Sequence, residues 1–182
     1  MKLLIISGST GNPSHTNAAL KYLESYLLLK NHEVVFYNLA EEKLPFANAK
    51  YHHSPLEFPD AIVQDFVYHA QSCNAFVIGT PNYHNSFSGL LKNALDILNI
   101  KHFYLKPVGL VTHSGGIRST EPLGQLRLVI RGLQGIAIPT QIATCNSDYI
   151  NKETGFALEN NLIIERAIDF CDQLIEMTAK LK

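Results

Sequence analysis

Three polar loops hold the residues best suited to bind a small ligand. The first is Ser7-Gly8-Ser9-Thr10-Gly11-Asn12-Pro13-Ser14-His15-Thr16-Asn17. Hydroxyls and backbone N–H groups at the start of a helix are the donors that a phosphate needs. The loop has no Lys or Arg, no Gly-x-Gly-x-x-Gly spacing and no Gly-Lys-Ser/Thr ending, so it differs from dinucleotide folds and nucleotide P-loops. A phosphate monoester held by neutral donors fits this pattern; the alternative is an ordinary capped turn.

The second loop is Pro81-Asn82-Tyr83-His84-Asn85-Ser86-Phe87-Ser88-Gly89. It places backbone donors beside aromatic surface, which suits a flavin ring because that ring has a polar rim and apolar faces. A long structural turn is the alternative interpretation. His84 is a candidate for polarising a substrate, and a packing or backbone-bonded role is the alternative for it.

The third loop is His113-Ser114-Gly115-Gly116-Ile117. Its glycines allow the backbone to approach a ligand closely. We do not expect Ser114 to be a hydrolase nucleophile, because Thr112 stands where the Gly-x-Ser-x-Gly turn requires glycine. The sequence therefore predicts no catalytic side chain in this loop.

Histidine and cysteine patterns predict no metal site and no disulfide framework. The eight histidines include no His-x-x-x-His pair, and the adjacent His52 and His53 would point to different sides. The three cysteines, Cys73, Cys145 and Cys171, are an odd number and widely spaced. This usage fits a reducing cytoplasm.

Apolar runs that alternate with helical stretches must position the three loops. The predicted strands are 3–6, 33–38, 75–80, 108–112 and 136–144. The first predicted helix begins near Ser14 or Thr16. Two more span about 60–72 and 88–98, and a fourth lies between Pro122 and Gly135. The fifth follows an apolar stripe comprising Ile163, Ala167, Phe170, Leu174, Met177 and Leu181. Strict alternation of five strands and five helices predicts a doubly wound α/β fold with a parallel sheet of order 2-1-3-4-5.

This topology brings the loops together, since ligands of such sheets bind beyond the carboxyl ends of the strands. The three loops follow the first, third and fourth predicted strands. The fifth strand contains Pro139, which cannot donate to a ladder, so we expect it at the sheet edge.

Two features predict a homo-oligomer, at least a dimer. The loop 44–58 is long for an α/β connection and is interpreted as a lid or a subunit contact. The helix Leu90–Leu98 has six apolar residues among nine positions, more than one sheet-facing stripe requires. A monomer would expose the remainder, so we expect this helix in an interface and the long loop over a neighbour's site.

Length and charge limit which classes of protein this chain can belong to. The 182 residues suit one domain, 1–182. A net charge of −1, from 15 Lys+Arg against 16 Asp+Glu, argues against nucleic acid as a partner. The first residues are too short an apolar run for a signal peptide or membrane span, so we expect a soluble, cytoplasmic protein without a membrane partner.

The loops together resemble those of NADPH-dependent FMN reductases, and the middle of the chain resembles bacterial FMN-dependent NADPH-azoreductases. The residues that carry the resemblance are Gly8-Ser9, Ser14–Asn17, Gly79–His84, Ser88–Asp96, Lys106–Leu110, Ser114–Gly116 and Gly135–Thr144. The resemblance implies a flavodoxin-like fold, FMN as cofactor, NADPH as electron donor and a tetramer. It also implies two-electron, ping-pong reduction of azo compounds, quinones or flavins as small-molecule acceptors, with the chemistry carried by FMN.

The resemblance further assigns the cofactor-binding residues. It implies that Ser9, Ser14, Thr16 and Asn17 surround the FMN phosphate, that Pro81, Asn82, Tyr83 and His84 line the isoalloxazine, and that Ser114, Gly115 and Gly116 approach its pyrimidine end. The chain departs from broader FMN reductases at two places. Gly11 or Asn12 stands where those often have arginine, and Asn82 stands where they often have glutamate.

Two other functions remain open at the level of sequence. The run Gly8–Asn12 also resembles the phosphate loop of flavodoxin electron carriers, although such carriers are usually strongly acidic and this chain is not. The other alternative is a flavodoxin-like module that binds a ligand or partner without catalysis. A yellow purified protein would favour the flavin, and steady NADPH oxidation would separate a reductase from a carrier.

Overall fold

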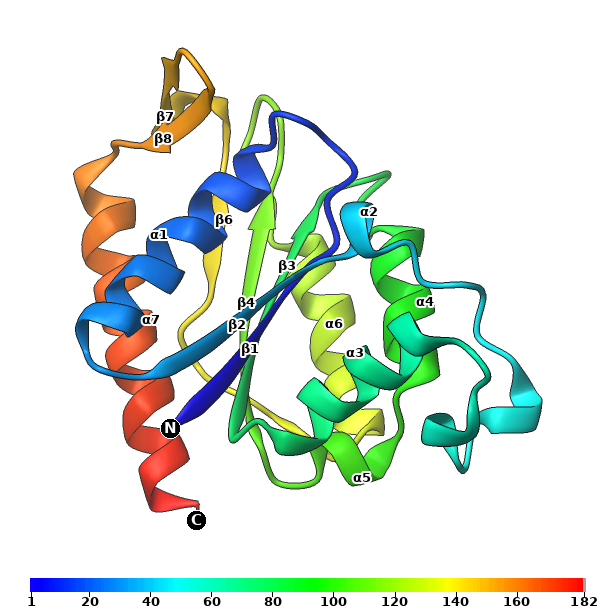
Figure 1. Ribbon diagram of the computed structural model, residues 1–182. Coiled ribbons are helices and arrows are strands. Elements are labelled where there is room, and N and C mark those ends of the chain that lie inside the picture. Colours follow the sequence, from blue (N-terminus) through cyan, green and yellow to red (C-terminus); the bar gives the residue numbers. More distant parts are fainter. Residues whose placement is uncertain (182) are drawn as a thin grey trace.

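A parallel β-sheet runs through the centre of the chain, and helices cover both of its faces (Figure 1). The computed structural model describes residues 1–181. The strands are β1 (Lys2–Ser7), β2 (Glu33–Asn38), β3 (Ala75–Pro81), β4 (Pro107–His113), β5 (Ile136–Ala137) and β6 (Ile142–Thr144). Their order is β2-β1-β3-β4-β5, with β6 also paired to β4. The predicted order 2-1-3-4-5 is confirmed.

The helices divide into two layers. On one face lie α1 (His15–Leu29) and α7 (Asn161–Lys180), and on the other lie α3 (Ala61–Ser72), α4 (Gly89–Ile97) and α6 (Glu121–Gly132). The remaining helical segments are short: α2 (Leu39–Glu42), α5 (Ile100–Phe103) and the 3-10 turns η1 (Ala49–Tyr51), η2 (Pro55–Glu57) and η3 (Asn146–Asp148).

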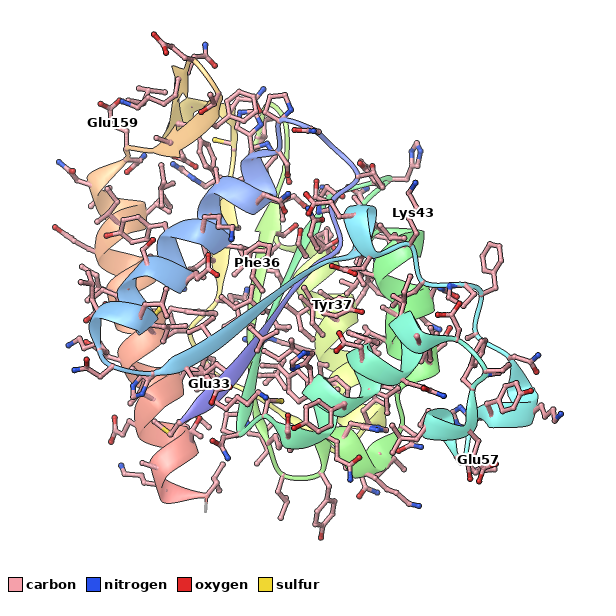
Figure 2. All side chains as sticks on the ribbon, in the orientation of Figure 1. Glu33, Phe36, Tyr37, Lys43, Glu57 and Glu159 are labelled. Carbon is pink, nitrogen blue, oxygen red and sulfur yellow. The ribbon has the colours of Figure 1, made fainter. Side chains whose placement is uncertain are left out.

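Side chains of each strand pack against both helix layers, which explains the continuous apolar runs. In β1, Leu3 and Ile5 belong to the core under α1 and α7, whereas Leu4 and Ile6 belong to the core under α3, α4 and α6. Figure 2 shows the same alternation in β2, where Phe36 and Tyr37 project to opposite faces. Both faces of the sheet are therefore covered.

Capping side chains begin four of the helices, and the starts predicted near Ser14, at 60 and at 88 match the structure. Ser14 accepts a hydrogen bond from the backbone N–H of Asn17, and Ser88 accepts one from Leu91. Asp60 and Asn160 cap α3 and α7 in the same way. Because each cap satisfies N–H groups that have no partner inside the helix, these residues set where each loop ends.

The prediction of one continuous strand over 136–144 is wrong. The segment breaks between β5 and β6, and Pro139 lies in the break. Proline has no N–H to donate, and the guanidinium of Arg127 instead binds the carbonyls of Ile138 and Pro139 at 2.8 and 3.2 Å. Both pieces pair with β4, so the edge position expected from Pro139 is retained.

Strict alternation of strands and helices is also wrong. An antiparallel hairpin of β7 (Tyr149–Lys152) and β8 (Gly155–Leu158) separates β6 from α7. In Figure 1 it stands above the start of α1 and the end of β6. The sequence analysis placed no element in this segment.

One predicted helix end differs from the structure and another matches it. In α7 the buried stripe ends on Thr178, whereas Leu181 is 44% exposed and Met177 is only half-buried. The helix expected between Pro122 and Gly135 is α6, which ends at Gly132, so Gly135 lies past its end as predicted. The residue with left-handed backbone after this helix is Gln134, with a φ of 59°.

Helix α4 is covered by the chain itself. Its apolar residues Leu91, Leu95 and Ile97 are at most 4% exposed. The segment 44–58 lies against it, since Asn93 donates to the carbonyl of Pro45 at 2.9 Å and accepts from the N–H of Ala47 at 2.9 Å. The premise that a monomer would expose this helix is therefore wrong, and an interface is not needed to explain its composition.

Candidate functional site

The three predicted loops meet at one edge of the sheet. The N–H of Gly8 donates to the carbonyl of Gly79 at 2.8 Å, and the hydroxyls of Thr10 and Tyr83 lie 3.1 Å apart. Asn82 then joins the second loop to the third. Its backbone N–H donates to the carbonyl of His113 at 2.7 Å, and its amide lies 3.3 Å from the hydroxyl of Ser114. The order of the strands thus produces one continuous polar surface from three distant segments.

Hydroxyl groups build the first loop from within. Ser14 caps α1 and donates to the hydroxyl of Ser9 at 2.7 Å, and Ser9 in turn accepts from the N–H of Gly11 at 3.3 Å. Asn17 accepts a hydrogen bond from the hydroxyl of Ser7. Ser9 and Thr16 are 4% and 1% exposed. All four residues implied to surround a phosphate therefore lie in or beside this network.

Several donors of the loop are unused. Within residues 1–181 no hydrogen bond engages the backbone N–H of Thr10, Asn12, His15 or Thr16. The last two belong to the first turn of a 15-residue helix, where the aligned peptide dipoles favour an anion. A phosphate monoester can accept from these groups without a neighbouring cation.

The second loop makes a tight turn that presents its rings outward. Tyr83 and Ser86 exchange two backbone hydrogen bonds, of 2.9 and 3.0 Å. His84 and Asn85 between them both have left-handed backbone, with φ of 53° and 62°, as a two-residue turn of this kind requires. Tyr83 is 44% exposed, and His84 is exposed as well. Pro81 is buried as the last residue of β3.

Asn82 offers an acceptor that the protein does not use. Its Oδ1 atom is buried and has no hydrogen-bond partner within residues 1–181. A buried polar atom without a partner is costly. A ligand that brings a ring N–H to this point would remove that cost, which fits the polar rim of a flavin.

The third loop is open where its glycines stand. Ser114 is 6% exposed, whereas a side chain built on Gly115 or Gly116 would meet no other atom within 4 Å. The carbonyl of Gly115 accepts from the N–H of Asn146 at 2.9 Å. The loop is thus held at its start, with free space above its glycines.

A buried carboxylate fixes the far end of this loop. Asp148 is fully buried and receives two hydrogen bonds from Arg118, one from the N–H of Cys145 at 2.8 Å and one from Asn160 at 2.8 Å. Burial opposes its charge, but these donors outweigh burial and hold the pKa of Asp148 below its ordinary value. The ion pair ties the loop after β4 to the base of the hairpin.

Sequence analysis missed an aromatic cluster beside the first loop, formed by His15, His113, Tyr149 and Phe156. The imidazole of His15 lies between Phe156, with ring centroids 3.5 Å apart, and His113, 4.4 Å away. Tyr149 packs edge-on against both histidines. The only available signal was that His15 and His113 each stand inside a predicted loop.

Burial disfavours the charged form of both stacked histidines. Burial, and then the proximity of His15, lower the pKa of His113 to about 4. Burial also lowers the pKa of His15. Both ring nitrogens of His113 are hydrogen-bonded: Nδ1 lies 3.1 Å from the hydroxyl of Thr144, and Nε2 donates to the amide oxygen of Asn146 at 3.2 Å. Neutral rings can stack without the repulsion that two cations would suffer.

The described part of the chain has no metal centre of the usual kind. Among residues 1–181 no three His, Cys, Asp or Glu side chains are arranged to hold an ion. In the same residues no helix has the length and apolar character needed to cross a membrane. The site built by the three loops consists of neutral hydrogen-bond donors, the exposed rings of Tyr83 and His84, and the unpartnered Oδ1 atom of Asn82.

Comparisons with known proteins point to one family of proteins. The family described as NADPH-dependent FMN reductase matches residues 1–148, so the match ends one residue before β7. An FMN-dependent NADPH-azoreductase of Staphylococcus haemolyticus (strain JCSC1435) is 43% identical over 176 residues, which are 96% of this chain and 94% of the relative.

Two solved structures agree with the fold. FerB, a flavoenzyme NAD(P)H:(acceptor) oxidoreductase from Paracoccus denitrificans, matches with a TM-score of 0.78 at 18% identity, covering 98% of this chain and 97% of that one. A flavodoxin from the domain Archaea matches with a TM-score of 0.62 at 12% identity, covering 100% and 99%. The predicted flavodoxin-like fold is confirmed.

Proposed function

Because the chain belongs to the NADPH-dependent FMN reductase family, and is thus an oxidoreductase that uses FMN and NADPH, we propose that it reduces azo compounds, quinones or flavins by ping-pong two-electron transfer. The observation that supports this most is the convergence of three loops on one edge of the sheet, with free amide donors at one end and exposed rings at the other. One shared binding surface suits two substrates that take turns.

The first loop is proposed to hold the FMN phosphate. Ser9, Ser14, Thr16 and Asn17 would surround it, and the unused N–H groups of His15 and Thr16 would donate to it. Neutral donors are sufficient here because the helix start supplies partial positive charge. When bound, FMN supplies the hydride chemistry that no side chain provides.

The other two loops are proposed to orient the ring. Pro81, Asn82, Tyr83 and His84 would line the isoalloxazine, and the buried Oδ1 of Asn82 is the acceptor available to a ring N–H. Ser114, Gly115 and Gly116 would approach the pyrimidine end, where the absence of side chains leaves room. The exposed Tyr83 and His84 then bound the space in which either substrate stacks.

Initial-rate kinetics tests whether the two substrates share one binding surface. Rates measured at several fixed acceptor concentrations, with NADPH varied, should give parallel double-reciprocal lines, because one substrate must leave before the other binds. Intersecting lines would mean that both substrates bind together and would refute this part of the proposal. Running the series with a quinone, an azo dye and free flavin ranks the acceptors.

Assembly and location are further parts of the proposal. We propose a homo-oligomer, a dimer or a tetramer, now supported by the 89% exposed Phe46 of the segment 44–58 and no longer by α4. Light scattering of the flavin-loaded protein at micromolar concentration should give at least the mass of a dimer, and Phe46→Asp should lower it. A monomer mass for the wild-type chain would refute assembly.

A cytoplasmic location is supported by three cysteines that all remain unpaired.

A further inference from the structure

We propose that the hairpin β7–β8 is a positioning element of the cofactor site, in which Phe156 holds the imidazole of His15 and thereby the first turn of α1 in its phosphate-binding geometry. This inference rests on the proposed phosphate role of the first loop. It assigns a task to a segment outside the matched family residues 1–148.

The contact between hairpin and loop is a stack of three rings. Phe156 lies over one face of His15, with ring centroids 3.5 Å apart and planes inclined by 13°. His113 lies over the other face at 4.4 Å and 5°. The imidazole of His15 is therefore clamped between β8 and the end of β4, and it cannot turn without breaking both contacts.

Clamping this side chain also fixes the backbone that carries it. His15 is the first residue of α1, directly after the cap Ser14. Its N–H and that of Thr16 are the helix-start donors that no other group within residues 1–181 engages. Since the direction of these N–H groups follows the orientation of the first turn, the stack sets where a phosphate is bound.

A second contact touches the loop on the other side of the cap. A side-chain carbon built on Gly155 would lie 3.3 Å from the Cβ of Pro13. Gly155 has a φ of 138°, a conformation that other residues rarely adopt. The hairpin therefore rests on Pro13 and on His15 at once, with Ser14 between them.

The hairpin is itself held in place by hydrogen bonds at both of its ends, as a positioning element must be. The hydroxyl of Tyr149 donates to Thr144 at 2.9 Å, and Thr144 is the last residue of β6, which pairs with β4. At the other end, the N–H groups of Glu159 and Asn160 donate to the carbonyl of Asp148, at 2.9 and 3.2 Å. Figure 2 labels Glu159 where β8 leads into α7. One end of the hairpin is thus hydrogen-bonded to β6, and the other end is hydrogen-bonded to the buried Asp148.

Comparing FMN with riboflavin tests the inference, because the two ligands share the ring and differ in the phosphate. Apo-protein is titrated with each ligand by quenching of flavin fluorescence. In Phe156→Ala the FMN dissociation constant should rise about threefold to tenfold, the size of a lost aromatic pair, and the riboflavin constant should not change. Equal weakening of both ligands, or of neither, would overturn the inference.

Further variants show whether Phe156 acts through His15. Phe156→Tyr keeps the ring and should restore FMN affinity, whereas Phe156→Leu keeps apolar bulk but should not. In a His15→Ala background, Phe156→Ala should have no additional effect on FMN. An undiminished effect in that background, or full rescue by leucine, would contradict the proposed path. These variants keep the test valid if Phe156→Ala does not fold.

The control variant is Tyr68→Ala, which removes a ring packed on a histidine of α3, His69, in the other helix layer. It should leave both dissociation constants unchanged. If the wild-type chain binds neither FMN nor riboflavin, the proposed function itself fails. If the wild-type chain binds FMN and Phe156→Ala binds it equally well, only the role of the hairpin fails.

Discussion

At the scale of single residues, Ser9 joins the end of β1 to the start of α1 through its hydroxyl. We predict that Ser9→Ala or Thr16→Ala weakens FMN binding by about tenfold to a hundredfold, because a hydrogen bond to a charged group contributes roughly 1.5–3 kcal/mol. Fluorescence titration of the apo-variants measures this. Ser25→Ala, which removes a hydroxyl bonded within α1, is the control. Wild-type affinity in both variants would remove the loop from the site.

The titration of His113 gives a prediction about pH. Its pKa is lowered in the fold from 6.5 to about 4, so the unfolded chain binds a proton more readily than the folded one. Stability is therefore unaffected above the unfolded value and falls as the pH drops from 6.5 towards 4. The melting temperature of the apo-protein should decline over that range.

A variant separates His113 from other titrating groups. His113→Asn should make the decline of melting temperature with acid shallower, whereas His53→Asn, in the exposed loop, should leave it as it was. His15 contributes in the same direction because burial lowers its pKa too. An unaltered slope in His113→Asn would show that this histidine is not held neutral.

Residue types alone indicated the polar network of the first loop but not the ring stack beside it. Ser9, Ser14 and Asn17 were found because hydroxyls and amides before a helix have a local pattern, and the structure joins them in one network. Phe156 was missed because its contact with His15 spans more than a hundred residues of sequence. No local pattern reports such a stack.

At the scale of elements, α7 lies close to the sheet because β4 has no side chain at Gly109. A Cβ built there would lie 2.2 Å from Cζ of Phe170. We predict that Gly109→Ala lowers the free energy of unfolding by roughly 1–3 kcal/mol through overpacking, measured by urea denaturation. Adding Phe170→Leu should recover part of the loss.

The matched control for this prediction is Gly124→Ala. Gly124 lies inside α6, and a Cβ there meets nothing within 4 Å. This substitution should leave stability unchanged or raise it by about 0.5–1 kcal/mol, since alanine is favoured over glycine in a helix. Equal stability of Gly109→Ala and wild type would show that α7 does not need this close approach.

Elements with strong local patterns were predicted, and elements held by tertiary contacts were not. The strand Glu33–Asn38 and the caps at Ser14, Asp60 and Ser88 match the structure. The hairpin was missed because each of its strands has only four residues, too few for a clear alternation. Its position depends on hydrogen bonds to β6 and to Asp148, which no local pattern reports.

At the scale of the whole molecule, the sheet order followed from alternation and connection rules that apply to any chain of this pattern. The interface predicted for α4 did not follow. Counting apolar residues cannot reveal which segment lies against them, and here the chain's own segment 44–58 lies against α4, with Pro45 and Ala47 hydrogen-bonded to Asn93 of that helix. Association must therefore be sought on other surfaces.

The most direct test of the central claim is the absorbance of the flavin during one turnover. Purified protein is loaded with FMN, freed of oxygen and mixed with NADPH, and an acceptor is added after the spectrum settles. We predict that the oxidised flavin band bleaches with NADPH before any acceptor is present, and that it returns when a quinone or azo dye is added. A chain that takes up no FMN, or whose flavin stays oxidised in excess NADPH, would contradict the account.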